Sequence, residues 1–244
     1  MQEEHSQAFA NAETLKSKYP SDLTWDIDIP ETDLFTFLDE AIETYPTNKA
    51  INFLGTKMTY ADLGREIDKA AQGLHDMGIG KGDKVGLYMP NTPYYPIMFF
   101  AALSLGAVVV NYSPLYTEEE LKNQIENSDT DLMVTLDLKV FNSKVSSLKD
   151  KGVLSKMVTC SLPAILPFAK RVGFYLLKGK EVVTSALSGI FNWRAKKDHQ
   201  ITTETNVDYR DLTAKKLSFA RPKIAPEDTA LLQYTGGTTG VSKG

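Results

Sequence analysis

Strand-like and helix-like segments alternate over residues 33–136, and this alternation restricts the fold more than any other feature of the sequence. Short apolar runs are followed by stretches of 10–15 residues in which apolar side chains recur every three or four positions. Strands that alternate with helices of this length predict βαβ units, whose right-handed crossovers place parallel strands in one sheet. The sequence therefore predicts an α/β fold.

The expected elements can be placed along the chain. We expect strands at 84–89, 107–111, 131–136, 154–159 and 229–234, and helices at about 94–105 and 138–150. A short hairpin is expected about Gly55-Thr56. Two further helices should begin at capping boxes, in which a threonine and an acidic residue three positions later bond each other's backbone N–H groups. These pairs are Thr59 with Asp62 and Thr117 with Glu120. Residues 161–225 show no clear period, and 221–228 resemble an extended linker.

Composition excludes several classes of function. The chain has 244 residues, with 27 Lys+Arg against 31 Asp+Glu, and this acidic balance gives no support for nucleic-acid binding. One cysteine, Cys160, can form neither an intramolecular disulfide nor a cysteine-based zinc cluster. The three histidines are scattered, so we expect no metal-binding residue in the chain. These features are typical of a reduced, cytoplasmic protein.

Membrane contact is the second question that composition raises. The apolar run 97–110 is shorter than the roughly 20 residues of a spanning helix, and the acidic N-terminus does not resemble a secretory signal. Residues 151–200, however, carry nine basic and two acidic side chains around apolar segments. Two interpretations remain open. Residues 161–180 could contact an anionic membrane surface peripherally, or the block could be a solvated helical insertion packed on the protein.

The segment 234–244 carries the strongest functional signal. Its sequence is Tyr-Thr-Gly-Gly-Thr-Thr-Gly-Val-Ser-Lys-Gly, and it directly follows an expected strand. Glycines let backbone N–H groups approach an anion closely, while hydroxyls and a lysine add donors and charge. The order of Ser242 and Lys243 differs from a Walker A loop, and Gly78-Ile79-Gly80-Lys81-Gly82 follows a helix rather than the strand that a dinucleotide fingerprint requires. The segment predicts a polyphosphate site, with a simple tight turn as the alternative.

This segment resembles the phosphate-loop signature of the acyl-adenylate-forming (AMP-binding) superfamily. Supporting stretches are Met58–Leu63, Gly82–Leu87 and the segment from Pro90 to Thr117. Several details, among them Pro-Leu-Tyr-Thr at 114–117, are most similar to bacterial long-chain fatty-acid–CoA ligases. The resemblance implies that residues 33–244 are an incomplete N-terminal adenylation domain of parallel βαβ units, preceded by an extension at 1–32.

The resemblance also implies a reaction and its participants. A fatty acid carboxylate attacks the α-phosphorus of ATP, in the presence of Mg²⁺, and coenzyme A then displaces AMP to form acyl-CoA. The chemistry depends mainly on alignment and neutralisation of phosphate charge. Catalytic roles fall on Thr238 and Lys243. The expected ATP-binding residues are Thr235, Gly236, Gly237, Thr238, Thr239, Gly240 and Lys243.

Other elements of the superfamily signature follow this loop and are not among the 244 residues. They hold adenine, ribose and magnesium, and a small C-terminal domain supplies a lysine. We therefore expect this chain to be the N-terminal part of a ligase, either a truncated gene product or an incomplete sequence, and inactive alone. The alternatives are a ligase for another acid, and a non-catalytic module that binds a lipid or a partner.

Overall fold

The computed structural model describes residues 14–20, 22–23, 27–178 and 205–234. The chain divides into two units, Met1–Thr32 and Asp33–Gly244. In the first unit, residues 14–16 form a helical turn, and the Ser17 hydroxyl donates to the carbonyl of Thr14 at 2.8 Å. Everything that positions the candidate site belongs to the second unit.

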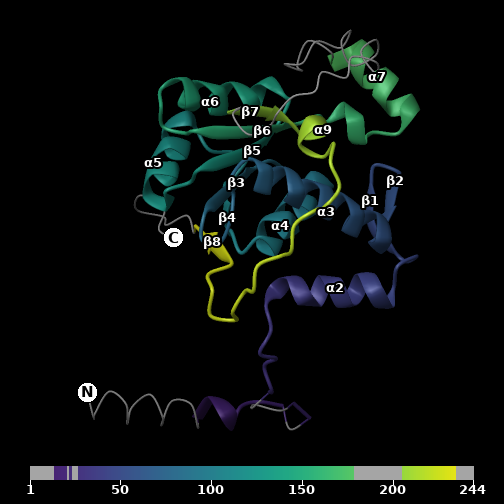
Figure 1. Ribbon diagram of the computed structural model, residues 1–244, viewed down its shortest axis with the longest axis vertical. Coiled ribbons are helices and arrows are strands. Elements are labelled where there is room, and N and C mark those ends of the chain that lie inside the picture. Colours follow the sequence, from purple (N-terminus) through teal and green to yellow (C-terminus); the bar gives the residue numbers. More distant parts are fainter. Residues whose placement is uncertain (1–13, 21, 24–26, 179–204, 235–244) are drawn as a thin grey trace. The chain divides into compact units, whose positions relative to one another are not determined.

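A six-stranded parallel sheet forms the centre of the second unit (Figure 1). The strands lie in the order β7-β6-β5-β3-β4-β8, and every neighbouring pair is parallel. This arrangement confirms the predicted α/β class. The strands are β3 (Lys84–Tyr88), β4 (Val108–Asn111), β5 (Leu132–Leu136), β6 (Lys156–Cys160), β7 (Asn206–Asp208) and β8 (Leu231–Gln233).

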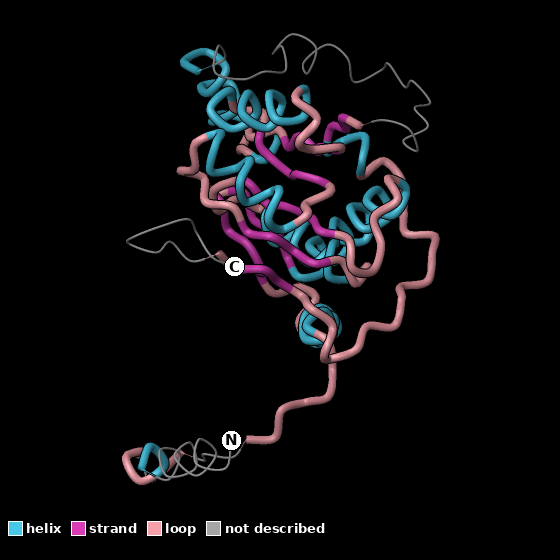
Figure 2. The backbone as a smooth tube through the Cα atoms, turned by 90° about the vertical axis from the view of Figure 1, so that its left-hand side faces the viewer, coloured by secondary structure: helices cyan, strands magenta, loops and turns pink. Residues whose placement is uncertain are grey.

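Helices cover both faces of this sheet (Figure 2). On one face α2 (Leu34–Thr44), α3 (Tyr60–Asp76) and α4 (Tyr94–Ser104) share a core with alternate strand residues such as Val85 and Leu87. On the other face α5 (Glu118–Ser128) and α6 (Lys139–Asp150) pack on Tyr88 and Met133. Successive strand side chains point to opposite faces, so a strand buried on both faces is apolar throughout.

Local signals explain where several elements begin. Thr59 with Asp62 and Thr117 with Glu120 form both predicted capping boxes, at the starts of α3 and α5. The hairpin of β1 (Lys49–Phe53) and β2 (Thr56–Thr59) turns at Leu54-Gly55, not at Gly55-Thr56 as predicted. Both turn residues have positive φ, 53° and 101°, which is the geometry of a two-residue turn that matches the strand twist.

Four elements lie in the segment without a clear period, and their bounds were not predicted, although one interpretation of the basic block expected a helix there. They are η1 (Pro163–Ile165), α7 (Phe168–Lys178), β7 and α9 (Tyr209–Leu212). Only Val207 of β7 is buried, so the strand carries no periodic signal and depends on pairing with β6. Residues 179–204, which include part of the basic block, lie outside the described residues. In the part that is described, no helix is both long and apolar enough to span a membrane.

Candidate functional site

The strand order creates a topological switch point at the carboxyl edge of the sheet. The connection that follows β3 contains α4 and runs on one face, whereas the connection that follows the adjacent β4 contains α5 and runs on the other. Ligands of open α/β sheets bind outside the carboxyl ends of strands at such a switch point. Because β8 pairs in parallel with β4, the segment that follows β8 begins at this same edge of the sheet.

A chain of hydrogen bonds links three elements at this edge. The hydroxyl of Tyr95, on α4, donates to Oδ1 of Asn111 at 2.7 Å, and Nδ2 of Asn111 donates to Oε1 of Gln233 at 2.8 Å. Burial raises the pKa of Tyr95, and the hydrogen bond to Asn111 opposes that shift only in part. Tyr95 therefore remains a neutral donor near pH 7, and the three side chains hold the ends of β4 and β8 together.

Tyr234 anchors the end of the chain's last described strand to α5. Its ring is buried in the core beneath α5 and α6, and its hydroxyl donates to Oδ1 of Asn127 at 2.5 Å. Behind it the hydroxyl of Tyr112 lies 3.1 Å from Ser128 Oγ and 2.7 Å from Thr130 Oγ1. Burial raises the pKa of Tyr112 to about 12, so this hydroxyl stays protonated as part of the network. The end of β8, just before residue 235, is thus held to β4 through Gln233 and to α5 through Tyr234.

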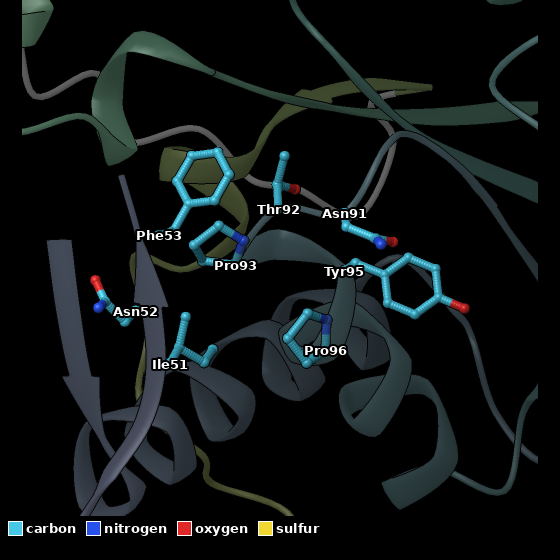
Figure 3. Close-up of a pocket in the computed structure, with 8 residues that line it drawn as sticks. All are labelled: Ile51, Asn52, Phe53, Asn91, Thr92, Pro93, Tyr95 and Pro96. Atoms are coloured by element: carbon cyan, nitrogen blue, oxygen red, sulfur yellow. The ribbon is translucent and has the colours of Figure 1, made fainter. Parts of the chain in front are cut away.

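An apolar hollow of about 250 Å³ opens beside the same edge. It lies between β1 and the start of α4, and Figure 3 shows Ile51, Phe53, Pro93 and Pro96 gathered around it. Tyr95 also lines the hollow, but its hydroxyl points away from these side chains, toward the hydrogen-bond chain (Figure 3). The remaining lining residues are Asn52, Asn91 and Thr92. A hollow of this character suits an apolar group.

Two ionisable side chains at this edge are bound to the protein itself. Asp137, which is buried directly after β5, accepts from the backbone N–H of Leu162 at 3.0 Å, and the Lys144 ammonium donates to the carbonyl of Tyr116 at 2.6 Å. Within the described residues, no three His, Cys, Asp or Glu side chains come together in a way that could hold a metal ion. The described residues therefore offer no site for Mg²⁺. Cys160 is fully buried, which raises the pKa of its thiol well above the usual value. That thiol is not a nucleophile at neutral pH.

The family of this protein follows from its match to a known family. A model of the AMP-binding enzyme family matches residues 38–244. The chain belongs to this family. The match extends to the glycine-rich residues 235–244.

Individual relatives of this AMP-binding enzyme agree with that assignment. The long-chain-fatty-acid–CoA ligase of Bacillus subtilis is 31% identical over 230 residues, which cover 93% of this chain and 38% of the relative. 4-Coumarate–CoA ligase 4 of Arabidopsis thaliana is 32% identical over 191 residues, 78% of this chain and 28% of the relative. The chain thus spans less than two-fifths of the length of these relatives.

The fold of this AMP-binding enzyme also matches solved structures. The crystal structure of an anthranilate CoA ligase in complex with anthranoyl-AMP aligns with a TM-score of 0.65 at 16% identity, over 88% of this chain and 34% of that chain. At that identity the match supports the fold alone. It agrees with the predicted adenylate-forming architecture.

The predicted nucleotide-binding residues of the enzyme lie outside the described residues. Thr235, Gly236, Gly237, Thr238, Thr239, Gly240 and Lys243 all follow Tyr234, so their roles stay predictions. The structure places only the point at which their segment starts. The sequence did not predict the hydrogen-bonded side chains Tyr95, Asn111 and Gln233, which lie up to 138 positions apart in the sequence. The one available signal was a polar residue at the end of each apolar strand, Asn111 after Val-Val-Val and Gln233 after Leu-Leu.

Proposed function

We propose that the protein is an acid–CoA ligase that activates a long-chain fatty acid with ATP. The observation that carries this proposal is that the Gly/Thr/Lys-rich segment directly follows β8, which pairs with β4 beside the switch point, in a chain that belongs to the AMP-binding enzyme family. The Bacillus subtilis relative is a long-chain-fatty-acid–CoA ligase, which supports the substrate class.

The proposed reaction has two steps. The acid carboxylate forms a bond to the α-phosphorus of ATP, the bond to the β-phosphate oxygen breaks, and pyrophosphate leaves. The thiolate of CoA then bonds to the acyl carbon, and AMP leaves with the carboxylate oxygen. AMP is a far better leaving group than hydroxide, so the adenylate makes the acid a usable acyl donor.

The chain's own residues would act mainly on the phosphates. Backbone N–H groups of Gly236, Gly237 and Gly240 would cradle the β- and γ-phosphates, because glycine lets the backbone approach closely. Thr238 and Thr239 would donate hydroxyl hydrogen bonds, and the Lys243 ammonium would balance charge as pyrophosphate leaves. The hydrogen bonds that join Tyr95, Asn111 and Gln233 would keep β8, the strand before this loop, in register with β4.

The domain boundaries and cellular location belong to the same proposal. We assign residues 33–244 to the N-terminal adenylation domain, with 1–32 as an extension. ATP, CoA and the fatty acid are the proposed partners, in the cytoplasm. A ligase for an aromatic acid is the second candidate, favoured by the similar identity of the 4-coumarate–CoA ligase relative.

The test measures acid-dependent thioester formation by the protein as its source cells make it. We expect palmitoyl-CoA and pyrophosphate to form faster from palmitate than 4-coumaroyl-CoA forms from 4-coumarate. Lys243→Ala should lower kcat/KM about 10²-fold, as expected for loss of one donor to a developing charge. Lys151→Ala, an exposed lysine paired with Glu118 at the surface, is the matched control and should change little. Thioester formation from 4-coumarate alone would contradict the substrate assignment.

A further inference from the structure

The side chain of Gln124, on α5, is a buried amide with one half unpaired. It is only 4% exposed, and its Nε2 donates to the carbonyl of Asn111 at 2.9 Å. Within the residues that the structure describes, its Oε1 accepts from no group. Leaving a buried acceptor without a partner costs most of its desolvation free energy, so folded proteins pair nearly all such groups.

This amide lies at the end of the ladder between β4 and β8. Asn111 is the last residue of β4, and it pairs with Gln233, the last residue of β8. The bonds of a parallel ladder are evenly spaced along the two strands. By donating to the carbonyl of Asn111, the Gln124 amide occupies the place of one further rung, where the chain leaves the sheet.

Tyr234, the residue after β8, lies against the same helix. Its hydroxyl donates to Oδ1 of Asn127 at 2.5 Å, and its ring is buried beneath α5 and α6. Asn127 follows Gln124 by three positions, so the two side chains lie on neighbouring turns of one side of α5. The chain therefore passes Gln124 as it leaves β8.

The peptide group between Tyr234 and Thr235 is oriented by a second contact. The carbonyl of Tyr234 accepts from Nε2 of Gln233 at 3.4 Å. The Gln233 side chain lies on the α4 face of the sheet, where it accepts from Asn111. The C=O and N–H groups of a trans peptide point in opposite directions. The N–H side of this peptide group is therefore directed to the other face, which α5 covers.

The hydroxyl groups nearest to Gln124 are already engaged. Ser128 Oγ donates to the main-chain carbonyl of Gln124 at 2.7 Å, and the hydroxyl of Tyr112 lies 2.7 Å from Thr130 Oγ1. These groups do not supply the missing donor to Oε1.

We propose that Gln124 is a positioning residue for the segment 235–243, and that its Oε1 accepts a hydrogen bond from the backbone N–H of Thr235. The amide then joins the last carbonyl of β4 to the first residue after Tyr234, and it fixes the direction in which the segment leaves the sheet. The consequence for ATP rests on the proposed function. A segment with a fixed start loses less conformational entropy when it binds the phosphates.

The test measures the hydrogen exchange rate of the Thr235 amide by NMR, without nucleotide. Gln124→Met removes the donor and the acceptor but keeps the length of the side chain. Gln124→Glu keeps an acceptor and loses the donor to Asn111. The matched control is Gln72→Met on α3, which replaces a second glutamine that is 4% exposed and whose Oε1 accepts from the Ser218 N–H at 2.7 Å.

In the unaltered protein we expect the Thr235 amide to exchange at least about tenfold more slowly than in an unstructured peptide. Gln124→Met should raise the rate about tenfold, whereas Gln124→Glu should stay within about threefold and Gln72→Met within about twofold. Unprotected exchange in the unaltered protein would overturn the proposal even if no variant folds. An unchanged rate in Gln124→Met would also overturn it, because a water molecule would then be the partner of Oε1. So would equal increases in Gln124→Met and Gln124→Glu, or in Gln124→Met and Gln72→Met.

A second measurement connects this role to the nucleotide. By calorimetry, Gln124→Met should weaken the binding of ATP about fivefold and leave that of AMP within about twofold. Absence of ATP binding by the unaltered protein would contradict the proposed function alone, because the exchange experiment contains no ATP. Slow exchange at Thr235 that Gln124→Met accelerates would support the role of Gln124 in either case.

Discussion

Single polar residues organise the carboxyl edge of the sheet. Asn111 accepts from Tyr95 and donates to Gln233, and its own carbonyl accepts from Nε2 of Gln124 at 2.9 Å. Tyr112 connects the same strand end to Ser128 and Thr130. None of these contacts could be predicted from the sequence, because each joins residues that only the folded chain brings together. The expected phosphate loop gives a signal in the sequence because its residues are contiguous, and its role stays a prediction.

Tyr112→Phe tests the buried hydroxyl network. We expect it to lower the free energy of unfolding by about 1 kcal/mol, because Ser128 and Thr130 lose a partner but still lie 2.7 Å from each other. Urea denaturation measures the change. Tyr45→Phe, which removes a hydroxyl from an exposed position at the end of α2, is the control and should have little effect. Equal losses in the two variants would contradict a role for the network.

The pH dependence of stability follows from the same residue. Burial raises the pKa of Tyr112 to about 12, above the value of about 10 in an unfolded chain. The folded protein thus holds a proton that the unfolded chain releases, so this contribution is complete below about pH 10 and is lost as pH rises toward 12. Between about pH 9.5 and 11 the stability of Tyr112→Phe should fall less steeply than that of the unaltered protein. Parallel curves would show that Tyr112 does not carry this effect.

Helices and strands differed in how far the sequence predicted them. The capped helices α3 and α5 begin at their predicted capping boxes, and the apolar strands β3, β4 and β5 each appear within one or two residues of their expected bounds, because these signals are local. β7 and α9 lack such signals. Their positions are determined by packing on β6 and on Gly73 of α3, which approaches Leu212 closely.

Gly73→Ala tests this close approach. A Cβ on Gly73 would lie 2.3 Å from the carbonyl oxygen of Leu212 and 2.5 Å from its Cγ. We expect a loss of about 1–3 kcal/mol from the clash, although alanine favours a helix intrinsically. The matched variant is Gly173→Ala on α7, where the added Cβ meets open space and should stabilise the helix slightly. Thermal denaturation of both variants measures the difference, and equal stabilisation would contradict the close packing of α9.

At the scale of the second unit, the segment after α9 returns the chain to the sheet along α2 and α3. Arg221 in this segment lies 3.2 Å from Asp39 on α2 and 2.5 Å from Asp68 on α3, and its guanidinium carbon is 4.2 Å from the centre of the Phe35 ring. The sequence predicted an extended linker here, but the side chain that holds it in place was not predictable. This attachment brings β8 to the open side of β4.

Arg221→Met tests the attachment. The methionine keeps the apolar stem but leaves two partly exposed carboxylates unpaired, so we expect a loss of about 1 kcal/mol and faster protease cleavage near residue 221. Arg65→Met, which removes a more exposed ion pair with Asp62 on α3, should cost less than about 0.5 kcal/mol and leave cleavage unchanged. Unchanged cleavage in Arg221→Met would contradict the role of Arg221.

The proposed role of residues 235–243 is to bind the β- and γ-phosphates of ATP. The most direct measurement compares the affinities of ATP and AMP by calorimetry, in the unaltered protein and in Lys243→Ala. We predict that ATP binds about tenfold or more tightly than AMP, because only ATP carries the phosphates that the loop contacts, and that Lys243→Ala removes most of this difference. Equal affinities for ATP and AMP, or a preference for ATP that Lys243→Ala leaves unchanged, would contradict the claim.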